Sequence, residues 1–400
     1  MIIGVPKEIM AGERRVALVP ERVAYLVGKG HQVLIETGAG AAAFFDDGSY
    51  TRAGAQIALD PRTLYAGVDL VLKVRAPAFD PDSEADEIDL LRQGAVLVAL
   101  LDPLAAPNRM GRLAARGVTS FSLDVIPRIT RAQSMDVLSS MATVAGYRAA
   151  LIGATQLGKF FPLLMTAGGT VVPARVLVLG AGVAGLQAIA TARRLGAVVQ
   201  AFDTRPLVRE QVESLGAGFL TLALDVGDAQ DAGGYARGLA EEAYAAERDL
   251  LREPVRQADV IITTATIPGG RAPVLLSAEM VASMRPGSVI VDLAAAGGGN
   301  CELSVPGERI VSGGVIIEAP TNLPASMPVH ASQLFARNAV AFVTHLLDHG
   351  LTPSAQGGSF DLTLDDEIVR ETCITYSSEV LHRATRERMS ARKEAVAANE

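Results

Sequence analysis

The chain has 400 residues, of which 49% are hydrophobic and 20% are charged, and its formal net charge is −8. This length allows two or three domains with large cores, and the composition is typical of a globular α/β protein rather than a disordered one. The negative charge gives no support for binding to nucleic acid or to an anionic membrane surface.

Cysteine usage and the N-terminus indicate a cytosolic setting. Cys301 and Cys373 show neither metal-ligand spacing nor a disulfide framework. Lys7 and Glu8 directly follow a short apolar run, which is unlike a signal peptide. No apolar stretch approaches the ~18–20 residues that span a bilayer. We therefore expect a chain that is soluble by itself, which leaves docking onto a membrane protein open.

The first 125 residues alternate short apolar runs with helical stretches. The apolar runs suit buried strands and occupy Met1–Val5, Gln32–Glu36, Asp69–Val74 and Ala95–Leu100. This alternation predicts a doubly wound domain around a parallel sheet. Residues 126–168 then have a mainly helical pattern with no obvious strand, and we interpret them as a connector to a second domain.

The stretch 175–205 predicts a nucleotide-binding unit. A branched apolar run, Val176–Leu179, is followed at once by the glycine-rich segment GAGVAG (180–185), which opens a helical pattern. A second predicted strand, Val198–Phe202, ends at Asp203. A lone glycine motif would be weak support, but here strand, glycines, helix, second strand and acidic end follow in the order that a dinucleotide-binding unit requires.

Each of these residues has a physical role in that interpretation. Gly180 permits the tight turn, Gly182 lets the backbone approach a pyrophosphate, and Gly185 lets the helix pack closely on the strand. The helix start offers free N–H groups to the phosphates. Asp203 is placed to accept hydrogen bonds from the adenine ribose and to repel a 2′-phosphate, which favours NAD over NADP. Arg205 argues the other way, because an arginine there could bind a 2′-phosphate. The alternative is a glycine-rich turn that has only a structural role and binds nothing.

Later parts of the chain complete the second domain. Further strands are expected at Asp259–Thr263, Ser288–Asp292 and Gly314–Ile317, and helical periodicity covers 332–350. The chain then becomes polar, and we expect residues 386–400 to form a frayed or free helical tail.

One connection is much longer than is usual in α/β units. Residues 222–256 contain Gly233, Gly234 and Tyr235, followed by a charged helical piece over 241–252. A long insertion beside a nucleotide site is a candidate lid that carries an aromatic side chain. The alternative is a surface excursion.

These elements predict an α/β fold with two Rossmann-like, doubly wound domains, mainly parallel sheets and long linking helices. We expect an N-terminal Rossmann-like domain over 1–137 that is completed by 326–385. The NAD-binding domain is expected over 138–325, and the tail over 386–400.

Motifs along nearly the whole folded part resemble one known family. The segments GVPKEIMAGERRVALVPE, LVLKVRAP and GAGVAGLQAIATARRLGA resemble both alanine dehydrogenase and the NAD-binding component (alpha subunit, soluble part) of proton-translocating NAD(P) transhydrogenase. Other segments resemble the transhydrogenase specifically. These are PRITRAQSMDVLSSMATVAGYRA, EQVESLGAGF, GGYA, GSVIVDLAAAGGGNCELS, TNLP and ASQLFARN.

The resemblance implies a set of site residues. Arg128 and Gln133 hold the nicotinamide ribose and carboxamide region, Gln133 reaches toward a second nucleotide, and Asp136 and Ser139 bind the carboxamide with support from Tyr147. We expect catalytic roles for Gln133, Asp136 and Arg128. Alone, this polar cluster is more often an ordinary helix start, although its side chains do offer the donor and acceptor that a primary amide needs. The expected cofactor-binding residues are Arg128, Gln133, Asp136, Ser139, Gly180, Ala181, Gly182, Val183, Asp203, Thr204, Arg205, Gly234, Tyr235, Ala265 and Thr266.

Departures from the alanine dehydrogenase pattern separate the two relatives. That enzyme binds and protonates its keto acid with a Lys and a His. This chain has Arg75 in place of the Lys and Leu101–Asp102 in place of the His, while Arg15 remains. Its histidines fit no acid/base arrangement near the expected nicotinamide loop. Hydride transfer between two nicotinamides needs ring orientation and exclusion of water but no proton donor, whereas reduction of a keto acid needs one.

We therefore predict the NAD(H)-binding component of a proton-translocating transhydrogenase. It would transfer hydride from NADH to NADP⁺ bound on a partner subunit. The resemblance implies a homodimer, separate membrane-embedded subunits that include the NADP-binding beta subunit, no nucleic-acid partner, and a cytoplasmic location at the inner face of the cell membrane. The alternatives are a free-standing alanine dehydrogenase-type enzyme and a non-catalytic NAD-binding regulator.

Overall fold

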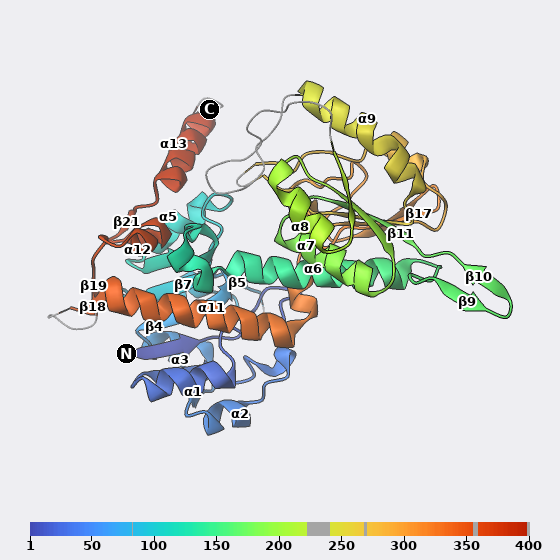
Figure 1. Ribbon diagram of the computed structural model, residues 1–400. Helices are drawn as coiled ribbons and strands as arrows, with labels where there is room; N and C mark the ends of the chain where they lie inside the picture. The colour runs from blue at the N-terminus through green and yellow to red at the C-terminus, as the bar shows by residue number, and fades with distance from the viewer. Residues whose placement is uncertain (82, 222–240, 268–269, 355–358, 398–400) are drawn as a thin grey trace. The chain divides into compact units, whose positions relative to one another are not determined.

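We describe the protein from a computed structural model that covers residues 1–400, of which 82, 222–240, 268–269, 355–358 and 398–400 are left undescribed (Figure 1). The chain forms two compact units. One comprises Met1–Met141 and Ala325–Glu400, and the other comprises Ala142–Pro324. Each is described by itself.

The first unit is built on a mainly parallel sheet. Among the described residues its eight strands follow the order β21-β20-β8-β7-β4-β1-β2-β3, and β20 alone runs against the others, so that its pairings with β8 and β21 are antiparallel. The series β3-β2-β1-β4-β7-β8 is the strand order of a Rossmann fold. The strands of this sheet are β1 (Ile2–Val5), β2 (Gln32–Glu36), β3 (Gln56–Ala58), β4 (Leu70–Arg75), β7 (Val96–Leu100), β8 (Thr119–Ser122), β20 (Cys373–Tyr376) and β21 (Glu379–Val380).

Helices cover both faces of this sheet. On one face Leu64, Met110 and Leu113 belong to a buried cluster with strand residues such as Val71 and Leu97. The remaining elements of the unit are α1 (Pro20–Gly28), α2 (Asp47–Arg52), α3 (Pro61–Gly67), α4 (Glu87–Leu90), α5 (Pro107–Ala115), α11 (Pro328–His349), α12 (Glu367–Thr372), α13 (Arg383–Ala397), the 3₁₀ turns 41–43, 123–125 and 130–135, and the hairpins β5 (Phe79–Asp80)–β6 (Ala85–Asp86) and β18 (Leu351–Pro353)–β19 (Phe360–Leu362).

The second unit repeats the architecture. Its described strands form a sheet in the order β13-β12-β11-β14-β15-β17-β16, parallel except for the edge pair β16–β17. The strands are β11 (Arg175–Leu179), β12 (Val198–Phe202), β13 (Gly218–Leu220), β14 (Val260–Thr263), β15 (Val289–Asp292), β16 (Arg309–Ser312) and β17 (Val315–Glu318). The helices are α7 (Val183–Arg194), α8 (Arg209–Ser214), α9 (Glu241–Gln257) and α10 (Ala278–Ala282), with 3₁₀ turns at 206–208 and 295–297. Two Rossmann-like units with mainly parallel sheets confirm the predicted fold class.

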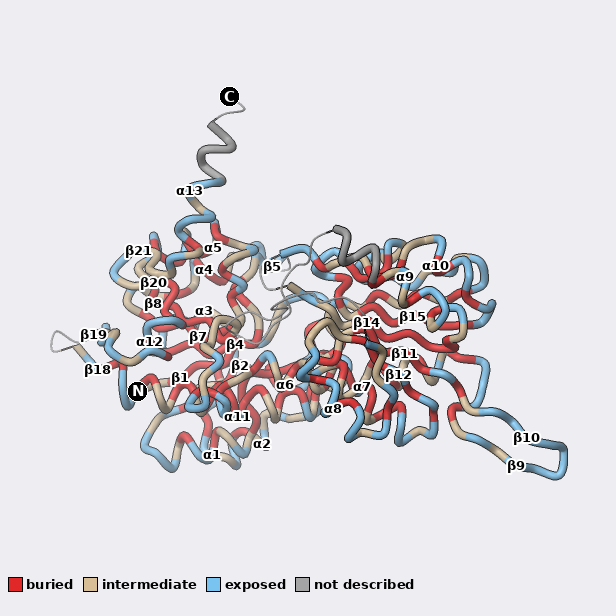
Figure 2. Tube along the Cα trace, turned by 45° about the horizontal axis from the view of Figure 1, so that its top comes forward, coloured by how far each residue is buried: buried red, intermediate tan, exposed pale blue. Residues whose placement is uncertain are grey.

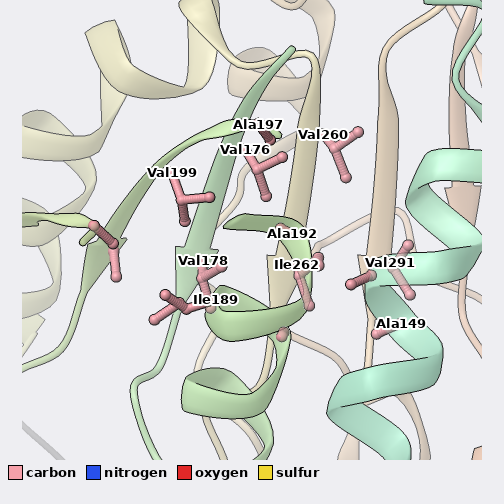
Figure 3. Close-up of a cluster of buried hydrophobic side chains, with 14 of the residues drawn as sticks. Ala149, Val176, Val178, Ile189, Ala192, Ala197, Val199, Val260, Ile262 and Val291 are labelled. Atoms are coloured by element: carbon pink, nitrogen blue, oxygen red, sulfur yellow. The ribbon is translucent and has the colours of Figure 1, made fainter. Parts of the chain in front are cut away.

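Alternation along the strands divides the core of the second unit into two layers. Val176 and Val178 of β11 point to the same side as Ile189 of α7 and Ala149 of α6 (Val137–Gln156), as Figure 3 shows. The intervening residues face the other side, where they join a cluster with side chains of α9 and α10. Strands buried on both faces read as continuous apolar runs, which is why their positions were predictable. In Figure 2 the central strands of each unit are accordingly red.

Helix α6 corrects the expectation that no apolar stretch is long enough to span a bilayer. It is 20 residues long, with a mean hydropathy of 1.2 over an 18-residue window, and by length and composition alone it could cross a membrane. Small residues of this helix pack inside the second unit. A Cβ on Gly146 would lie 2.0 Å from the carbonyl oxygen of Ala184, and one on Gly153 would lie 2.7 Å from Cγ1 of Val260. Gly146 and Gly153 therefore let α6 pack closely against α7 and β14.

The connector also differs from the prediction of a strand-free segment. It contains β9 (Leu164–Thr166), which pairs antiparallel with β10 (Gly169–Val171). This hairpin extends from the second unit (Figure 1), and Met165 in the middle of β9 is 79% exposed. An exposed two-stranded ribbon lacks the long buried run that marks a central strand, so the sequence pattern missed it.

The C-terminal segment takes part in the first unit. Strand β20 adds antiparallel to β8, and the hydroxyls of Ser120 and Thr375 lie 2.7 Å apart in the core. Helix α13 begins at Arg383, Thr385 is buried, and Met389 lies against Gly111 of α5. The start of the segment expected to be a free tail is thus packed on the unit.

Candidate functional site

The glycine-rich turn lies at the carboxyl edge of the sheet in the second unit. It follows β11, which has β12 on one side and β14 on the other. The chain leaves β11 for β12 and later returns to β14, so the strand order reverses beside β11. In open α/β sheets, ligands bind at such a reversal, beyond the carboxyl ends of the strands.

The three glycines have distinct environments. Gly180 has a φ of +98°, which strongly favours glycine. A Cβ on Gly185 would lie only 1.9 Å from the carbonyl oxygen of Gly180, so a side chain there would separate helix from turn. A Cβ on Gly182 would meet nothing closer than a guanidinium nitrogen of Arg205 at 4.0 Å. Gly180 and Gly185 are thus required by the fold itself, whereas Gly182 leaves open space above the turn.

Helix α7 begins directly after this open position. Its N-cap is Gly182, which has no side chain to accept from the first-turn N–H groups. The α7 N-terminus therefore directs N–H groups and the positive end of its dipole into the space above Gly182. This combination is the usual binding site for a pyrophosphate.

Asp203 accepts more hydrogen bonds within the protein than its predicted contact with a ribose requires. Its carboxylate accepts hydrogen bonds from the backbone N–H of Ala181 (2.7 Å) and from the backbone N–H of Arg205 (2.9 Å). The Arg205 guanidinium donates two more, from Nε and Nη2, each at 2.9 Å. Asp203 thus fixes the glycine turn and forms an ion pair with Arg205. The hydroxyl of Thr204 is buried and has no hydrogen-bond partner among the described residues, so it is a polar atom available to a ligand.

The loop after β14 is held by a side chain that the sequence analysis did not select. Asn300 accepts from the backbone N–H of Ala265 (3.0 Å) and donates to the backbone carbonyls of Ala265 and Pro273 (2.8 Å each). Asn300 is held in turn by Asp292, whose carboxylate accepts from its backbone N–H at 2.9 Å and from the hydroxyl of Thr263 at 2.8 Å.

This network fixes the backbone at Ala265 and leaves Thr266 exposed. One feature of the sequence could have pointed to this network. The predicted strand over 288–292 ends in an aspartate, as does the strand that ends at Asp203, and both acids follow apolar runs at the same edge of a parallel sheet.

The segment with Arg128 and Gln133 belongs to the first unit. Gln133 is exposed on the 3₁₀ turn 130–135, and Arg128 is exposed just before that turn. Asp136 caps the start of α6, because its carboxylate accepts from the backbone N–H of Ser139 (2.8 Å) and from its hydroxyl (2.6 Å). In this structure Asp136 and Ser139 therefore satisfy each other, as an ordinary helix start would.

The same turn is anchored by elements far away in the sequence. The side-chain amide of Asn338 on α11 donates to the carbonyl of Ser134 at 2.8 Å. Arg131 forms an ion pair with Asp366 at 3.0 Å, and Asp366 also contacts His345 at 2.9 Å. These contacts anchor the turn that carries Gln133.

The predicted site residues therefore fall into two groups. The glycine turn, Asp203, Thr204, Arg205, Ala265 and Thr266 lie together at one edge of the second unit, and Tyr147 belongs to that unit too. Arg128, Gln133, Asp136 and Ser139 belong to the first unit. Gly234 and Tyr235, with the predicted lid, lie outside the described residues.

Comparisons with known proteins agree with this architecture. The family model for the N-terminal domain of alanine dehydrogenase/PNT matches residues 4–145, and the model for the C-terminal domain matches residues 149–383. The chain belongs to the alanine dehydrogenase/PNT family. An NAD(P) transhydrogenase subunit alpha protein of Rhodospirillum rubrum is 46% identical over 96% of this chain and 98% of its own length.

Within the alanine dehydrogenase/PNT family, the chain resembles transhydrogenase subunits more than dehydrogenases. A crystal structure of transhydrogenase from Sinorhizobium meliloti matches with a TM-score of 0.83 and 40% identity, over 95% of this chain and all of that chain. The alanine dehydrogenase of Bacillus subtilis is 32% identical over 88% of this chain and 86% of its own length.

Arg15 and Arg75, which the sequence analysis compared with alanine dehydrogenase, and the neighbouring Lys73 each lie near a glutamate in the first unit. Arg15 and Glu13 are both buried, and their guanidinium–carboxylate contacts measure 2.6 and 2.7 Å. Arg75 lies 3.9 Å from the same carboxylate. Lys73, also buried, lies 2.6 Å from Glu87. Arg15 therefore has a buried salt bridge in place of a free cationic head.

Proposed function

We propose that this chain binds NADH and transfers its hydride to NADP⁺ held on a partner subunit of a proton-translocating transhydrogenase. The observation that carries the proposal is the pairing of Arg15 with Glu13. Reduction of a keto acid needs a free cation for the carboxylate and a proton donor for the carbonyl. Here Glu13 neutralises the guanidinium of Arg15, which would otherwise supply the free cation. Hydride exchange between nicotinamides needs neither group.

The residues of the second unit fit a dinucleotide. The open space above Gly182 and the uncapped start of α7 suit a pyrophosphate. The ribose edge contains the buried hydroxyl of Thr204 beside Asp203. The bound dinucleotide supplies the hydride. The chain's own residues orient it, with Asn300 holding the Ala265 backbone that flanks the nicotinamide and Gln133 directed to the second nucleotide.

We also propose a homodimer and a position at the inner face of the cell membrane through partner subunits that include the NADP-binding beta subunit. The hairpin β9–β10 supports the homodimer, because Met165 and Val172 are 79% and 64% exposed on or beside it. Apolar side chains gathered on a projecting ribbon are typical of a protein–protein contact. Sedimentation of the chain with Met165→Asp tests this, since loss of a dimer is expected.

One mixing assay tests the proposed reaction. NADH oxidation is followed with pyruvate and ammonia, and separately with NADP⁺ plus an NADP-binding partner component. We expect turnover only in the second mixture. Turnover with pyruvate and ammonia alone would identify an amino-acid dehydrogenase instead. Binding of NADH with no activity in either mixture would identify an NAD-binding regulator.

A further inference from the structure

Glu247 lies on the face of α9 that packs against the sheet of the second unit. It precedes Leu251 by four residues and Val255 by eight, and both of these contribute to the cluster that contains Leu179 and Phe202. Residues at this spacing share one helix face. Helix α9 ends two residues before Asp259, which lies at the starting edge of β14, so the helix runs antiparallel to the strands. Glu247 therefore lies toward their carboxyl ends, where the glycine turn and Asp203 are.

The carboxyl group of Glu247 lacks a partner within the part of the chain that the structure describes. The residue is fully buried, and neither side-chain oxygen has a hydrogen-bond partner among the residues that the structure describes. Buried carboxylates are normally paired, because an unpaired one retains the cost of leaving water. Burial and then the negative charge of Asp203 raise the pKa of Glu247 to about 7, while the positive charge of Arg248 opposes the shift. Leu251, one turn further along α9, shares a buried cluster with Phe202, which directly precedes Asp203, so the two acids lie on neighbouring elements.

Glu247 determines the net charge that a ligand meets at this edge of the sheet. Asp203 and Arg205 form a compact ion pair, so their charges nearly cancel for a ligand. With only this pair, the edge would not repel a 2′-phosphate, and the arginine would attract one. An unpaired glutamate beside the pair gives the edge a net negative charge. In a buried setting this charge acts over several ångströms without direct contact.

We propose that Glu247 is the residue that excludes NADP(H) from this site, by placing an uncompensated negative charge beside the Asp203–Arg205 pair. This inference rests on the proposed NADH binding. A 2′-phosphate carries up to two negative charges and meets this field, whereas the 2′-hydroxyl of NADH carries none. Among the described residues, the charged groups that act on Glu247 are Asp203, at the end of β12, and Arg248 on α9 itself, and Asp203 is in turn paired with Arg205.

The test compares the dissociation constants of NADH and NADPH by titration calorimetry for the wild type, Glu247→Gln and Glu253→Gln. Glutamine keeps the size of the side chain and removes its charge. Glu253 lies on the same helix but is exposed and paired with Arg256, so it is the matched control. We expect Glu247→Gln to tighten NADPH binding at pH 8 by about tenfold and to change NADH binding less than threefold. The control variant should match the wild type.

A pH series provides a second measurement, made on the wild type and on Glu247→Gln. In the wild type, the preference for NADH over NADPH should rise between pH 6 and pH 8, as Glu247 loses its proton. The phosphate itself titrates near pH 6, so the comparison is made with Glu247→Gln, in which the rise attributable to the protein should disappear. An unchanged preference in the variant, or equal weakening of both ligands, would overturn the inference. A wild type that binds no NADH would overturn the proposed function instead.

Discussion

The carboxylate of Asp203 accepts a hydrogen bond from the backbone N–H of Ala181 at 2.7 Å, which joins the end of β12 to the glycine turn. The acid expected to contact only the ribose therefore also holds the phosphate-binding turn in place. This dual role changes what removal of the acid should do.

We expect Asp203→Ala to weaken NADH binding by about ten- to a hundredfold, since it removes a charged acceptor and a support of the turn. Removing the acid also releases Arg205, so NADPH binding should weaken less or improve. Titration calorimetry with both nucleotides measures the two effects. An equal loss for NADH and NADPH would mean that Asp203 acts only on the turn.

The glycine turn offers a sharp contrast between two alanine substitutions. Gly185→Ala should destabilise the chain strongly, because its Cβ would stand 1.9 Å from a backbone oxygen. Gly182→Ala should leave the melting temperature nearly unchanged, because its Cβ enters open space. It should nevertheless reduce NADH affinity by about tenfold or more if a pyrophosphate occupies that space. Calorimetric melting and nucleotide titration separate the outcomes, and full NADH affinity in Gly182→Ala would place the pyrophosphate elsewhere.

Gln133→Asn tests the exposed turn of the first unit. Shortening the side chain by one methylene should slow hydride exchange with the NADP-binding partner by about tenfold or more, because reacting groups must be held closely. NADH affinity should change little. Stopped-flow measurements give the rate of hydride exchange, and equilibrium titration gives the NADH affinity. If this variant and Asp203→Ala lose NADH binding equally, our assignment of Gln133 is wrong.

Asn300→Ala removes the side chain that holds both the N–H and the carbonyl of Ala265. The loss of three hydrogen bonds should lower the free energy of unfolding by about 2–4 kcal/mol. It should also slow hydride exchange more than it weakens NADH binding, because the loop after β14 loses its support. Denaturant unfolding and exchange rates are the measurements. Normal exchange in a destabilised variant would show that the loop does not flank the reacting ring.

The pKa of Glu247 predicts a pH dependence of stability. Because the folded state raises this pKa from its ordinary value to about 7, the folded state binds the proton more tightly than the unfolded state does. The stabilisation is fully present below about pH 4.5 and is lost as the pH rises through 7. Glu247→Gln should therefore match the wild type near pH 4.5 and exceed it at pH 8 by about 3 kcal/mol. Urea unfolding of both proteins at the two pH values provides the check, and a gain that is equal at both would contradict the assignment.

Much of the fold was predictable because its signals are local. Strand Val198–Phe202 was predicted with its observed bounds, since a run buried on both faces is apolar throughout. The hairpin β9–β10 and the C-terminal strand β20 were missed, because short or edge strands lack that pattern and are fixed by the strand they pair with.

The candidate site shows the same division. The sequence by itself determined the glycine turn, the start of α7 and the acid at the end of β12, since backbone geometry and residue spacing dictate them. Only the tertiary structure decided that Arg205 and Arg15 form ion pairs with Asp203 and Glu13. It alone also decided that Asn300 holds the backbone of Ala265 and that Glu247 has no partner among the described residues. The hydrogen bonds of Asn300 join residues 27 to 35 positions apart. The ion pairs of Arg205 and Arg15 join residues two positions apart, but they form only because the folded backbone turns the two side chains toward each other, and the charge available to a ligand depends on these pairings.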